Sequence, residues 1–516
     1  MIIDKSQIIE SLIGNLVMLE HNYFSYSKFI QIKLIRFISL ICFGSVMIVS
    51  NAEVMYADES EIPSERLVTW NPGIKGEIPK AKLVLKLTAN KLKANASKVI
   101  QAAIDKIETP GTILLPSGKF NLKSALILKS GVILKGARLQ KTYLNFNLDK
   151  TKTINAITIS GQENDHVLFI SETLKAGSLK IKMKKTTGLK KNDLILIYCE
   201  NNPKRMYTKS KWNVSWARHA QGQLVKLINI SGNSIEIDTP LRLTFNVSFK
   251  PKIKVIKPIE SVGIEDLHIK RLDKNEGSII AFKWALNCWV RNITSAYCMR
   301  AHVWIHTSRF ISISGSFFHH AYDYGGGGHG YGIVAGKHTT DSLFENNIFK
   351  SLRHSMMVKQ GANGNVFSYN YSIENKLCDV SIHGHYSYMN LFEGNKVQLI
   401  TYADYWGPTG PLTTCFRNKV STSIIIRDHS HKANIILNTL DQGTIQTEKS
   451  CENIFYYRNR VKGKIQGKLS KNAKPVPASL YLSGPPDFWG KRPWPGIGTD
   501  VKNIMLPSES RYRKKK

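Results

Sequence analysis

The chain has 516 residues, of which 42% are hydrophobic, and it carries a formal net charge of +34. The apolar content excludes wholesale disorder and is sufficient for a large hydrophobic core. The positive charge favours polyanionic partners such as nucleic acid, acidic glycans or anionic lipid, although lysine spread along the whole chain also fits a purely compositional origin. No nucleic-acid-binding module is recognisable, so the sequence favours an acidic polysaccharide over nucleic acid.

The N-terminal residues have the pattern of an export signal. A cationic segment (28–36) precedes an apolar run (37–49), and small residues follow at 50–52, a spacing typical of signal-peptide cleavage. The apolar run is too short for a comfortable membrane span. We therefore expect residues 1–52 to be a secretory signal peptide or an N-terminal anchor. The protein is then expected to be secreted, periplasmic or on the cell surface, without a stable membrane span.

Cysteine usage is sparse. Of seven cysteines, Cys42 lies within the predicted signal. The remaining six permit disulfides in an oxidising compartment, but they form neither a dense framework nor a CxxC pair. The sequence therefore indicates no disulfide scaffold and no structural zinc site.

Residues 53–150 are expected to form an N-terminal cap and the first turns of a repeating fold. Apolar residues on one helical face, from Ile100 to Ile107, predict an amphipathic helix that Ser97 can cap. Short apolar strands separated by glycine-containing turns follow at 112–116, 125–128 and 132–134. Strands so short and so close together indicate a solenoid.

Residues 151–255 differ from the segments on either side. Two strands are predicted there, at 194–197 and 234–237, with an aromatic and basic stretch (207–219) between them. We expect this region to be an insertion or a side subdomain.

Residues 256–465 are self-similar and predict the main parallel β-helix. Their turn residues recur every 20 to 26 residues, apart from one interval of 32, and are Asp266, Asn292, Gly315, Asn347, Asn370, Asn395, Asn418, Asn438 and Asn459. Such a period predicts stacked β coils. Asn and Gly tolerate the left-handed backbone of sharp corners, and stacked Asn side chains can form hydrogen-bonded ladders.

The same repeat predicts which side chains fill the core and where the stack is interrupted. The expected inward residues are Val290, Phe344, Phe367, Phe392 and Ile435. The overlong interval, from Gly315 to Asn347, contains a glycine-rich loop with aromatic residues and one histidine at 322–332. Residues 466–516 are expected to form a C-terminal cap and a basic tail.

Three segments of the first half resemble a known family. Residues 100–105, the turn at 115–120 and residues 134–137 resemble the opening of the pectate-lyase-like superfamily, which includes rhamnogalacturonase-like and epimerase-like proteins. Residues 353–367 are similar to a group of bacterial β-helix proteins within it. The resemblance runs from about Thr69 to Asp500.

This resemblance implies an all-β fold, a right-handed single-stranded parallel β-helix with an N-terminal capping helix and a C-terminal cap, as a monomer. It does not select a reaction, because the superfamily hosts lyases, hydrolases, epimerases and inert adhesins on one scaffold. The acid pattern of polygalacturonase-like hydrolases is absent from the sequence, and so are the paired motifs of calcium-dependent pectate lyases. No complete catalytic set is carried over.

Four strands of the repeat are predicted to be equivalent: 302–306, 332–335, 355–359 and 379–383. Equivalent positions of successive coils form columns on the surface. At one end of these strands the alignment stacks His306, Lys359 and His383. At the other end it gathers Arg300, His302, His329, Arg353, His354 and Asp379. Two polar clusters are thus expected to border one face.

These clusters suit β-elimination on a uronic-acid polymer, which needs a neutralised carboxylate, a base for the C5 proton and an acid for the leaving oxygen. We assign Arg353 and Lys359 to the carboxylate, His354 or His383 to the base, and Tyr331 or Tyr388 to the acid. The predicted catalytic set is Arg353, His354, Lys359, His383, His329 and Tyr331. The predicted substrate-binding residues are Arg300, His302, His306, Trp304, Asp323, Asp379, His385, Tyr388, Tyr405 and Trp406.

Two other functions remain open. A hydrolase needs two carboxylates flanking the scissile bond, for which Asp323, Asp379 and Asp404 are available. A non-catalytic glycan-binding or surface-adhesion β-helix would use the same face. No cofactor is predicted. A calcium site remains open but is unsupported, because carboxylates are scarce. Apart from His383-Gly384-His385, the histidines follow no metal-binding spacing.

Overall fold

The structure is a computed structural model that describes residues 61–78, 83–137, 141–149, 151–206, 215–468 and 476–514. The predicted export signal, residues 1–52, lies outside the described residues. Among those described, no helix is long and apolar enough to cross a membrane.

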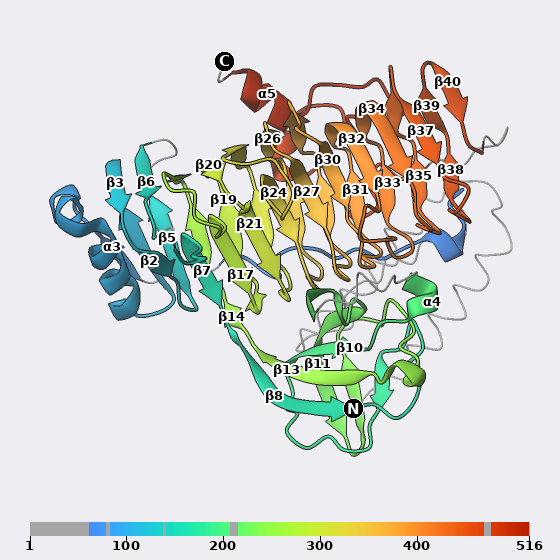
Figure 1. Cartoon of the computed structure of the whole chain (residues 1–516), viewed down its shortest axis with the longest axis horizontal. Helices are drawn as coiled ribbons and strands as arrows, with labels where there is room; N and C mark the ends of the chain where they lie inside the picture. The colour runs from blue at the N-terminus through green and yellow to red at the C-terminus, as the bar shows by residue number, and fades with distance from the viewer. Residues whose placement is uncertain are drawn as a thin grey trace, which may run out of the picture. The chain divides into compact units, whose positions relative to one another are not determined.

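Most of the chain is a parallel β-solenoid, in which each coil adds one strand to each of three parallel ladders (Figure 1). The first ladder is a sheet of twelve strands: β1 (Leu83–Lys86), β2 (Gly111–Leu115), β5 (Val132–Gly136), β15 (Gly263–Glu265), β19 (Trp289–Arg291), β22 (Ser312–Ser314), β25 (Leu343–Glu345), β28 (Val366–Ser368), β31 (Leu391–Glu393), β33 (Thr414–Phe416), β35 (Asn434–Ile436) and β38 (Phe455–Tyr457). The all-β solenoid expected from the period of the sequence is therefore confirmed.

The second ladder follows the first around each coil. Its members are β3 (Gly118–Leu122), β6 (Thr142–Phe146), β16 (His268–Arg271), β20 (Thr294–Cys298), β23 (Phe317–Ala321), β26 (Ile348–Lys350), β29 (Tyr371–Ile373), β32 (Lys396–Tyr402), β34 (Lys419–Ile426), β36 (Thr439–Leu440) and β39 (Asn459–Val461). The hairpin strand β40 (Lys464–Gln466) pairs antiparallel with β39 and so covers the backbone of this last strand.

The third ladder completes each coil. It runs through β4 (Leu126–Ile127), β7 (Ile157–Ser160), β17 (Ile280–Lys283), β21 (Ala301–His306), β24 (Tyr331–Ala335), β27 (His354–Val358), β30 (Cys378–Ile382), the second halves of β32 and β34, and β37 (Thr444–Thr447). The short strands β14 (Ile259–Glu260) and β18 (Ala285–Leu286) form a separate parallel pair.

The core of the solenoid consists of apolar side chains stacked in register. Phe344 pairs with Phe367, which pairs with Phe392, and the ring centroids of these neighbours are 4.5 and 5.1 Å apart. These three residues, together with Val290 and Ile435, are completely buried. All five residues predicted to face inward are thus confirmed, and their stacking explains why the apolar residue recurs once per coil.

The predicted asparagine ladder is confirmed, since its side chains are hydrogen-bonded to one another from coil to coil, but its members do not form the left-handed corners. The asparagine ladder consists of Asn347, Asn370, Asn395, Asn418, Asn438 and Asn459, all buried. Each side-chain oxygen from Asn370 to Asn459 accepts the backbone N–H of the preceding asparagine at 2.9 to 3.0 Å. The side-chain amides of these residues donate to a backbone carbonyl of an earlier coil.

The left-handed corner is formed by the residue before each asparagine, with φ between 45° and 64°. These corner residues are Asn346, Tyr369, Gly394, Arg417, Leu437 and Arg458. Gly315 aligns with Asn346 because Ser314 pairs with Glu345, so our alignment of Gly315 with Asn347 was wrong by one residue. The asparagine is required for its amide, which satisfies buried backbone groups between coils.

The N-terminal helix α3 (Ala89–Lys106) packs on the first coils. Its residues Leu92, Ile100 and Ile104 join the same hydrophobic core as the first strands. The helix is interrupted at Asn95, whose side chain accepts the N–H of Lys98. Ser97 does not cap the helix, contrary to our expectation, because its hydroxyl accepts the backbone N–H groups of residues 123 and 124.

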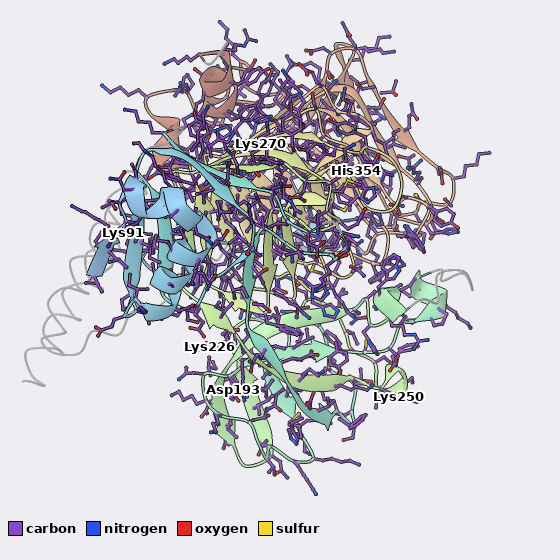
Figure 2. The ribbon with its side chains drawn as sticks, turned by 60° about the vertical axis from the view of Figure 1, so that its left-hand side comes forward. Lys91, Asp193, Lys226, Lys250, Lys270 and His354 are labelled. Atoms are coloured by element: carbon purple, nitrogen blue, oxygen red, sulfur yellow. The ribbon has the colours of Figure 1, made fainter. Side chains whose placement is uncertain are left out.

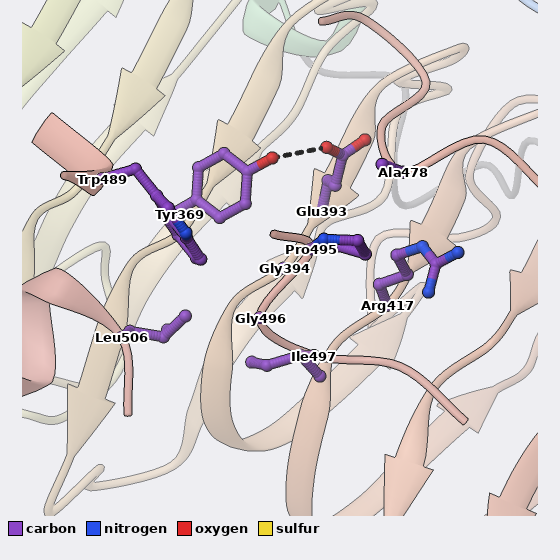
Figure 3. A pocket seen from close by; sticks show the side chains of 10 residues that line it. All are labelled: Tyr369, Glu393, Gly394, Arg417, Ala478, Trp489, Pro495, Gly496, Ile497 and Leu506. Carbon is purple, nitrogen blue, oxygen red and sulfur yellow. Dashed lines mark hydrogen bonds between the residues drawn. The ribbon is translucent and has the colours of Figure 1, made fainter. Parts of the chain in front are cut away.

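Two segments run lengthwise along the stack. Residues 61–78 include the short helix η1 (Ser64–Arg66) and contact several coils. The Arg66 side chain donates to the carbonyl of Asn453, and the Gly73 N–H donates to that of Asp341. Residues 476–514 include η5 (Asp487–Trp489) and α5 (Pro507–Arg513) and pack against the flank of the middle coils. The Tyr369 hydroxyl there donates to buried Glu393 (Figure 3).

Six more strands form a separate antiparallel sheet. This side sheet contains β8 (Gln162–Phe169), β9 (Lys180–Lys182), β10 (Leu194–Tyr198), β11 (Gly222–Ser231), β12 (Ser234–Ile237) and β13 (Lys252–Lys257). Its connections carry the short helices α4 (Pro203–Met206), η3 (Ser215–Ala217) and η4 (Val247–Phe249). It has its own apolar core, in which Ile195, Ile197, Val225 and Phe245 are buried.

The six cysteines of the described residues are free thiols, five of them buried: Cys199, Cys288, Cys298, Cys378, Cys415 and Cys451. The fold of these residues is therefore held by packing and hydrogen bonds.

Candidate functional site

A cleft of about 810 Å³ crosses the outer surface of the third ladder. Its lining comes from six successive strands, β21, β24, β27, β30, β32 and β34, together with the loops that follow them. Strands in a sheet are spaced by about 4.8 Å, so the cleft extends roughly 24 Å along the stack. Such a length accommodates several consecutive units of a linear polymer.

The cleft brings most of the predicted site residues together. Ten of them line it: Arg300, Trp304, His306, Tyr331, Arg353, His354, Lys359, His383, Tyr405 and Trp406. The strand register explains this grouping, since Tyr331 pairs with His354 and His354 with Cys378 at one end of the strands. The clustering anticipated from the repeat is thus a property of the fold, while the role of each residue stays a proposal.

At the other end of these strands, His306, Lys359 and His383 occupy one column. The pairs Ile305 with Ala335, Ala335 with Val358 and Val358 with Ile382 place the following residues in line. Gly336 occupies the remaining place in the column, so no side chain separates His306 from Lys359 there.

Lys359 lies near two aromatic rings. Its ammonium nitrogen is 5.0 Å from the ring centroid of Trp216 and 5.5 Å from that of Trp304. Burial lowers the pKa of Lys359 to about 8, with Asp404 opposing and Arg300 reinforcing the shift. Lys359 therefore exists partly as a neutral amine near neutral pH.

Asp404 and His383 form a pair beside Lys359. The Asp404 carboxylate accepts a hydrogen bond from His383 Nε2 at 2.8 Å and from the backbone N–H groups of Gly384 and Trp406. These donors outweigh burial and lower the pKa of Asp404 strongly. The other ring nitrogen of His383 is buried and has no hydrogen-bond partner among the residues that the structure describes.

His354 and Tyr331 stack at the opposite end of the strands, with ring centroids 5.1 Å apart. Burial lowers the pKa of His354 to about 3, so its ring is neutral, and its Nδ1 contacts the Cys378 sulfur at 3.0 Å. Burial raises the pKa of Tyr331, partly offset by Arg353, whose guanidinium lies 5.9 Å from the ring. Tyr331 therefore retains its phenolic proton at neutral pH.

Arg300 and Arg353 connect the cleft to the glycine-rich loop. Arg353 donates to the carbonyl of Gly325, and Arg300 Nε donates to that of Glu276 at 3.1 Å. Beside them His329 is bracketed by two half-exposed carboxylates, Asp323 at 2.5 Å and Glu276 at 2.9 Å. The loop lines the cleft through Gly327 and Gly328, so predicted residues His329 and Asp323 stand at its edge and are absent from its lining.

Two predicted binding residues point into the solenoid, which corrects their placement on the face. His302 is buried against Phe318 and is hydrogen-bonded to Ser295 and to a backbone carbonyl. Asp379 is buried and accepts hydrogen bonds from Ser372, Asn375 and two backbone N–H groups. The third-ladder register skips position 302 between its pairs, so simple alternation of inward and outward side chains fails there.

Two further predicted residues are enclosed near the side sheet. The Tyr388 hydroxyl is completely buried and donates to the carbonyl of Gly222 at 2.8 Å, which removes it from the cleft. His385 is buried against the rings of Trp216 and Trp406, whose centroids lie 4.7 and 5.7 Å away. Burial lowers the pKa of His385 to about 3.

The side sheet supplies one wall of the cleft, which the sequence alone did not reveal. It is docked by Arg309, which bonds Asp238 at 2.8 Å, and by Arg242, which bonds Asp341 at 2.5 Å. Trp216, from helix η3 between β10 and β11, then lines the cleft. Its only sequence signal was the aromatic and basic character of the stretch that contains it.

Other lining residues were also missed: Lys337, Gln360, Cys378, Ser381, Thr401, Ile425 and Arg427. Lys337 and Gln360 directly follow Gly336 and Lys359 of the aligned column, so extending the column alignment by one residue would have found them. Arg427 lies at the end of β34, beyond the four strands that were aligned. Within the described residues, no group of three or more His, Cys, Asp or Glu side chains is arranged to hold a metal ion.

The charge of the cleft differs from that of an average surface. Lysines are spread over α3, the side sheet and the solenoid, as Lys91, Lys226, Lys250 and Lys270 illustrate (Figure 2). The cleft lining in the described residues concentrates five cationic side chains against one carboxylate, that of Asp404. It is therefore suited to an anionic ligand.

No protein-family model and no curated protein matches the sequence. Among solved structures, the chain is similar to the Gp54 tailspike of Acinetobacter baumannii bacteriophage AP22, solved in complex with a capsular saccharide, with a TM-score of 0.54 and 13% identity over 72% of this chain and 68% of that chain. It is also similar to the gp49 tailspike of Pseudomonas phage LKA1, with a TM-score of 0.52 and 16% identity over 68% of this chain and 56% of that chain. At these identities the similarity supports the parallel β-helix fold alone.

Proposed function

We propose that the cleft binds an acidic polysaccharide and cleaves it by β-elimination, as lyases of the pectate-lyase-like superfamily do. The observation that carries this proposal is the excess of cationic side chains: Arg300, Lys337, Arg353, Lys359 and Arg427 face a single carboxylate. A uronate polymer places a carboxylate on successive sugars, so a cleft of this length meets several negative charges. The saccharide bound by the Gp54 tailspike agrees with a glycan ligand on this type of fold.

The geometry favours Lys359 as the base, which revises its role as a carboxylate partner. A base must be unprotonated at working pH and still have appreciable proton affinity. The pKa of about 8 gives Lys359 both properties, whereas the pKa of about 3 makes His354 a weak base. His383 is engaged by Asp404 through Nε2, and its other nitrogen is buried.

The remaining roles follow from the other cleft residues. Arg353 and Arg300 neutralise the C6 carboxylate, which makes the C5 proton more acidic. Lys359 takes this proton, the C4–O bond breaks, and a C4–C5 double bond forms. Tyr331, which keeps its proton because burial raises its pKa, donates that proton to the leaving oxygen. Trp304, Trp406 and exposed Tyr405 offer aromatic faces for the sugar rings.

Hydrolysis is the second candidate, carried by one specific observation. Asp323 and Glu276 are half-exposed carboxylates that contact opposite nitrogens of His329 at the edge of the cleft. Two carboxylates at the scissile bond are what glycoside hydrolysis requires. Their position outside the cleft lining, and their engagement by His329, make this arrangement less suited to catalysis than the Lys359 centre.

Incubation with a panel of uronans, including polygalacturonate and alginate, separates the candidates. Elimination produces an unsaturated uronate and a rise in ultraviolet absorbance, which we expect to disappear in Lys359→Met. New reducing ends without this absorbance would favour the hydrolase. Binding of a uronan without any cleavage would leave a glycan-binding protein, and the lyase proposal would then be wrong.

A further inference from the structure

The side sheet contributes directly to the surroundings of Lys359. The ammonium group lies near two rings, that of Trp304, which belongs to β21 of the solenoid, and that of Trp216, which belongs to helix η3 of the side sheet. Both distances are within the range of cation–π contacts. Among the described residues, no carboxylate forms a salt bridge with Lys359, and Asp404 acts on it through a coulombic interaction.

Contacts of its backbone, of its ring and of the next residue fix the position of Trp216. Its backbone carbonyl accepts a hydrogen bond from Gln360, the residue that follows Lys359. Its ring meets His385 and Trp406 edge to face, each with a centroid distance of 4.7 Å. The carbonyl of the next residue, Ala217, accepts a hydrogen bond from Asn201 at 2.9 Å. Trp216 itself is 38% exposed, and it lines the cleft together with Lys359, whose ammonium nitrogen lies 5.0 Å from its ring centroid.

We propose that Trp216 is a positioning residue of the reaction centre, through which the side sheet excludes water from the Lys359 amine and orients it toward the bound sugar. This inference rests on the proposed elimination reaction. It assigns to the side sheet a part in catalysis, because the solenoid alone supplies only one of the two rings. A tryptophan face beside the amine also offers a platform against which the reacting sugar stacks.

The electrostatic surroundings define what removal of Trp216 should do. Desolvation is the largest influence on the pKa of Lys359, while Asp404 raises it and Arg300 lowers it. His306 and His385 also lie near the amine, but burial holds the pKa of each at about 3, so they are neutral. Opening the Trp216 side to water therefore weakens the largest influence and leaves the charged neighbours in place. The lost cation–π attraction, about 0.5–2 kcal/mol, acts in the opposite direction. It is smaller than the lowering of the Lys359 pKa to about 8, which corresponds to about 3 kcal/mol. The pKa of Lys359 should then rise.

The test compares three variants of the full chain. Trp216→Ala removes the wall, Trp216→Phe keeps an aromatic face, and Phe169→Ala removes a 65% exposed aromatic residue elsewhere on the side sheet as the matched control. The pKa of Lys359 is measured by nuclear magnetic resonance after reductive methylation with isotope-labelled methyl groups, with Lys359→Arg identifying the signal. The pH profile of uronan elimination is recorded for the same variants, and thermal unfolding checks that each is folded.

For Trp216→Ala we expect the Lys359 signal to titrate at higher pH and the acid limb of the kcat/KM profile to move upward with it. Each unit of pKa increase lowers the neutral amine about tenfold at neutral pH, and activity falls in proportion. In Trp216→Phe, the Lys359 titration and the kcat/KM profile should both lie close to those of the native protein. Phe169→Ala should change neither the titration nor the profile. An unchanged Lys359 titration in folded Trp216→Ala would overturn the inference.

The inference and the proposed function fail in different ways. If the native protein cleaves no uronan, the elimination proposal is wrong, and the catalytic part of the inference with it. The methylated-lysine titration would still report whether Trp216 shields the amine. If elimination occurs but Trp216→Ala shifts neither the titration nor the pH profile, the reaction stands and the role of Trp216 is wrong.

Discussion

The asparagine ladder and the third ladder are built from the same coils, but their buried polar groups differ. Those of the asparagine ladder are hydrogen-bonded, whereas some at the third ladder are unpaired or have a shifted pKa. In the asparagine ladder, both polar atoms of residues such as Asn395 and Asn418 are hydrogen-bonded to neighbouring coils. On the third ladder, His383 keeps a buried nitrogen without a partner, and Lys359 has a lowered pKa. Satisfied polar groups stabilise a fold, whereas perturbed ones collect where chemistry is performed.

The largest expected effect is the loss of elimination activity when Lys359, at the third ladder, is replaced. Lys359→Met removes the amine and keeps the length of the side chain, so elimination should fall by roughly a hundredfold to ten-thousandfold, the usual contribution of a general base. Thermal unfolding should change little. Lys270→Met, a lysine on the second ladder outside the cleft, serves as the control in the same uronan assay. Comparable activity in Lys359→Met and the native protein would contradict the assignment.

The next effect concerns pH and the C-terminal segment. Burial raises the pKa of Glu393 to about 7, from 4.5 in an exposed side chain. Because the folded protein binds this proton more tightly than the unfolded chain, the stabilisation is complete below pH 4.5 and is lost as pH rises through about 7. This lowers the contribution of Glu393 to the free energy of unfolding by up to about 3 kcal/mol over this range. The buried histidines His306, His354 and His385, each with a pKa of about 3, act in the opposite direction. The contribution of Glu393 is therefore measured as the difference between the native protein and Glu393→Gln.

Chemical denaturation at a series of pH values measures this dependence. The free energy of unfolding of Glu393→Gln, relative to that of the native protein, should increase as pH rises from 4.5 to about 7. Glu345, whose pKa burial also raises to about 7, is present in both proteins and contributes equally to both. The exposed Glu108 supplies the control variant, Glu108→Gln. The same pH dependence in the native protein and in Glu393→Gln would show that the Glu393 carboxyl group is not buried as described.

A substitution in the asparagine ladder should lower the stability of the fold and leave the elimination activity of the folded protein unchanged. Asn395→Ala removes the acceptor for the Asn370 backbone N–H and the donor to the Phe367 carbonyl. Leaving such groups unsatisfied costs roughly 2 kcal/mol or more, which lowers the melting temperature. Asn121→Ala, at an exposed position of β3, is the matched control. If folded Asn395→Ala loses as much elimination activity as Lys359→Met, the asparagine ladder affects catalysis and the prediction is wrong.

The smallest expected effect lies at the rim of the cleft. Tyr405 is 62% exposed and offers an aromatic face to a sugar outside the reacting position. Tyr405→Ala should raise KM by roughly threefold to tenfold, which corresponds to about 1 kcal/mol of binding, and leave kcat unchanged. Steady-state kinetics on a long uronan and on a short oligosaccharide provide the check. A main effect on kcat would contradict this prediction and would show that Tyr405 acts on the reacting sugar.

The sequence predicted the solenoid and much of the cleft because both follow from one period. Stacked coils place residues one period apart in line, so His306, Lys359 and His383 could be aligned without a structure. His302 and Asp379 could not be placed correctly, since their inward direction depends on a local irregularity of the strands. A periodic pattern carries no information about such a bend.

Contacts between distant segments were also beyond the reach of the sequence. Trp216 reaches the cleft because Arg309 and Arg242 dock the side sheet through Asp238 and Asp341. Asp404 was identified only as a possible carboxylate for hydrolysis, and its pairing with His383 depends on the loop that follows β32. Both depend on tertiary packing that has no local signature.

The lengthwise segment at residues 61–78 gives the stack a property that repeats lack by themselves. In an array of coils each unit contacts only its neighbours, so the ends can fray independently. Here Arg66 donates to the carbonyl of Asn453, Trp70 to that of Met389, and the Lys75 backbone to the side chain of Asn287. Late coils are thereby tied to early ones by a few residues of extended chain. The coils bridged in this way should unfold together in one cooperative transition, which keeps the rows of cleft residues in register even when thermal motion loosens one end.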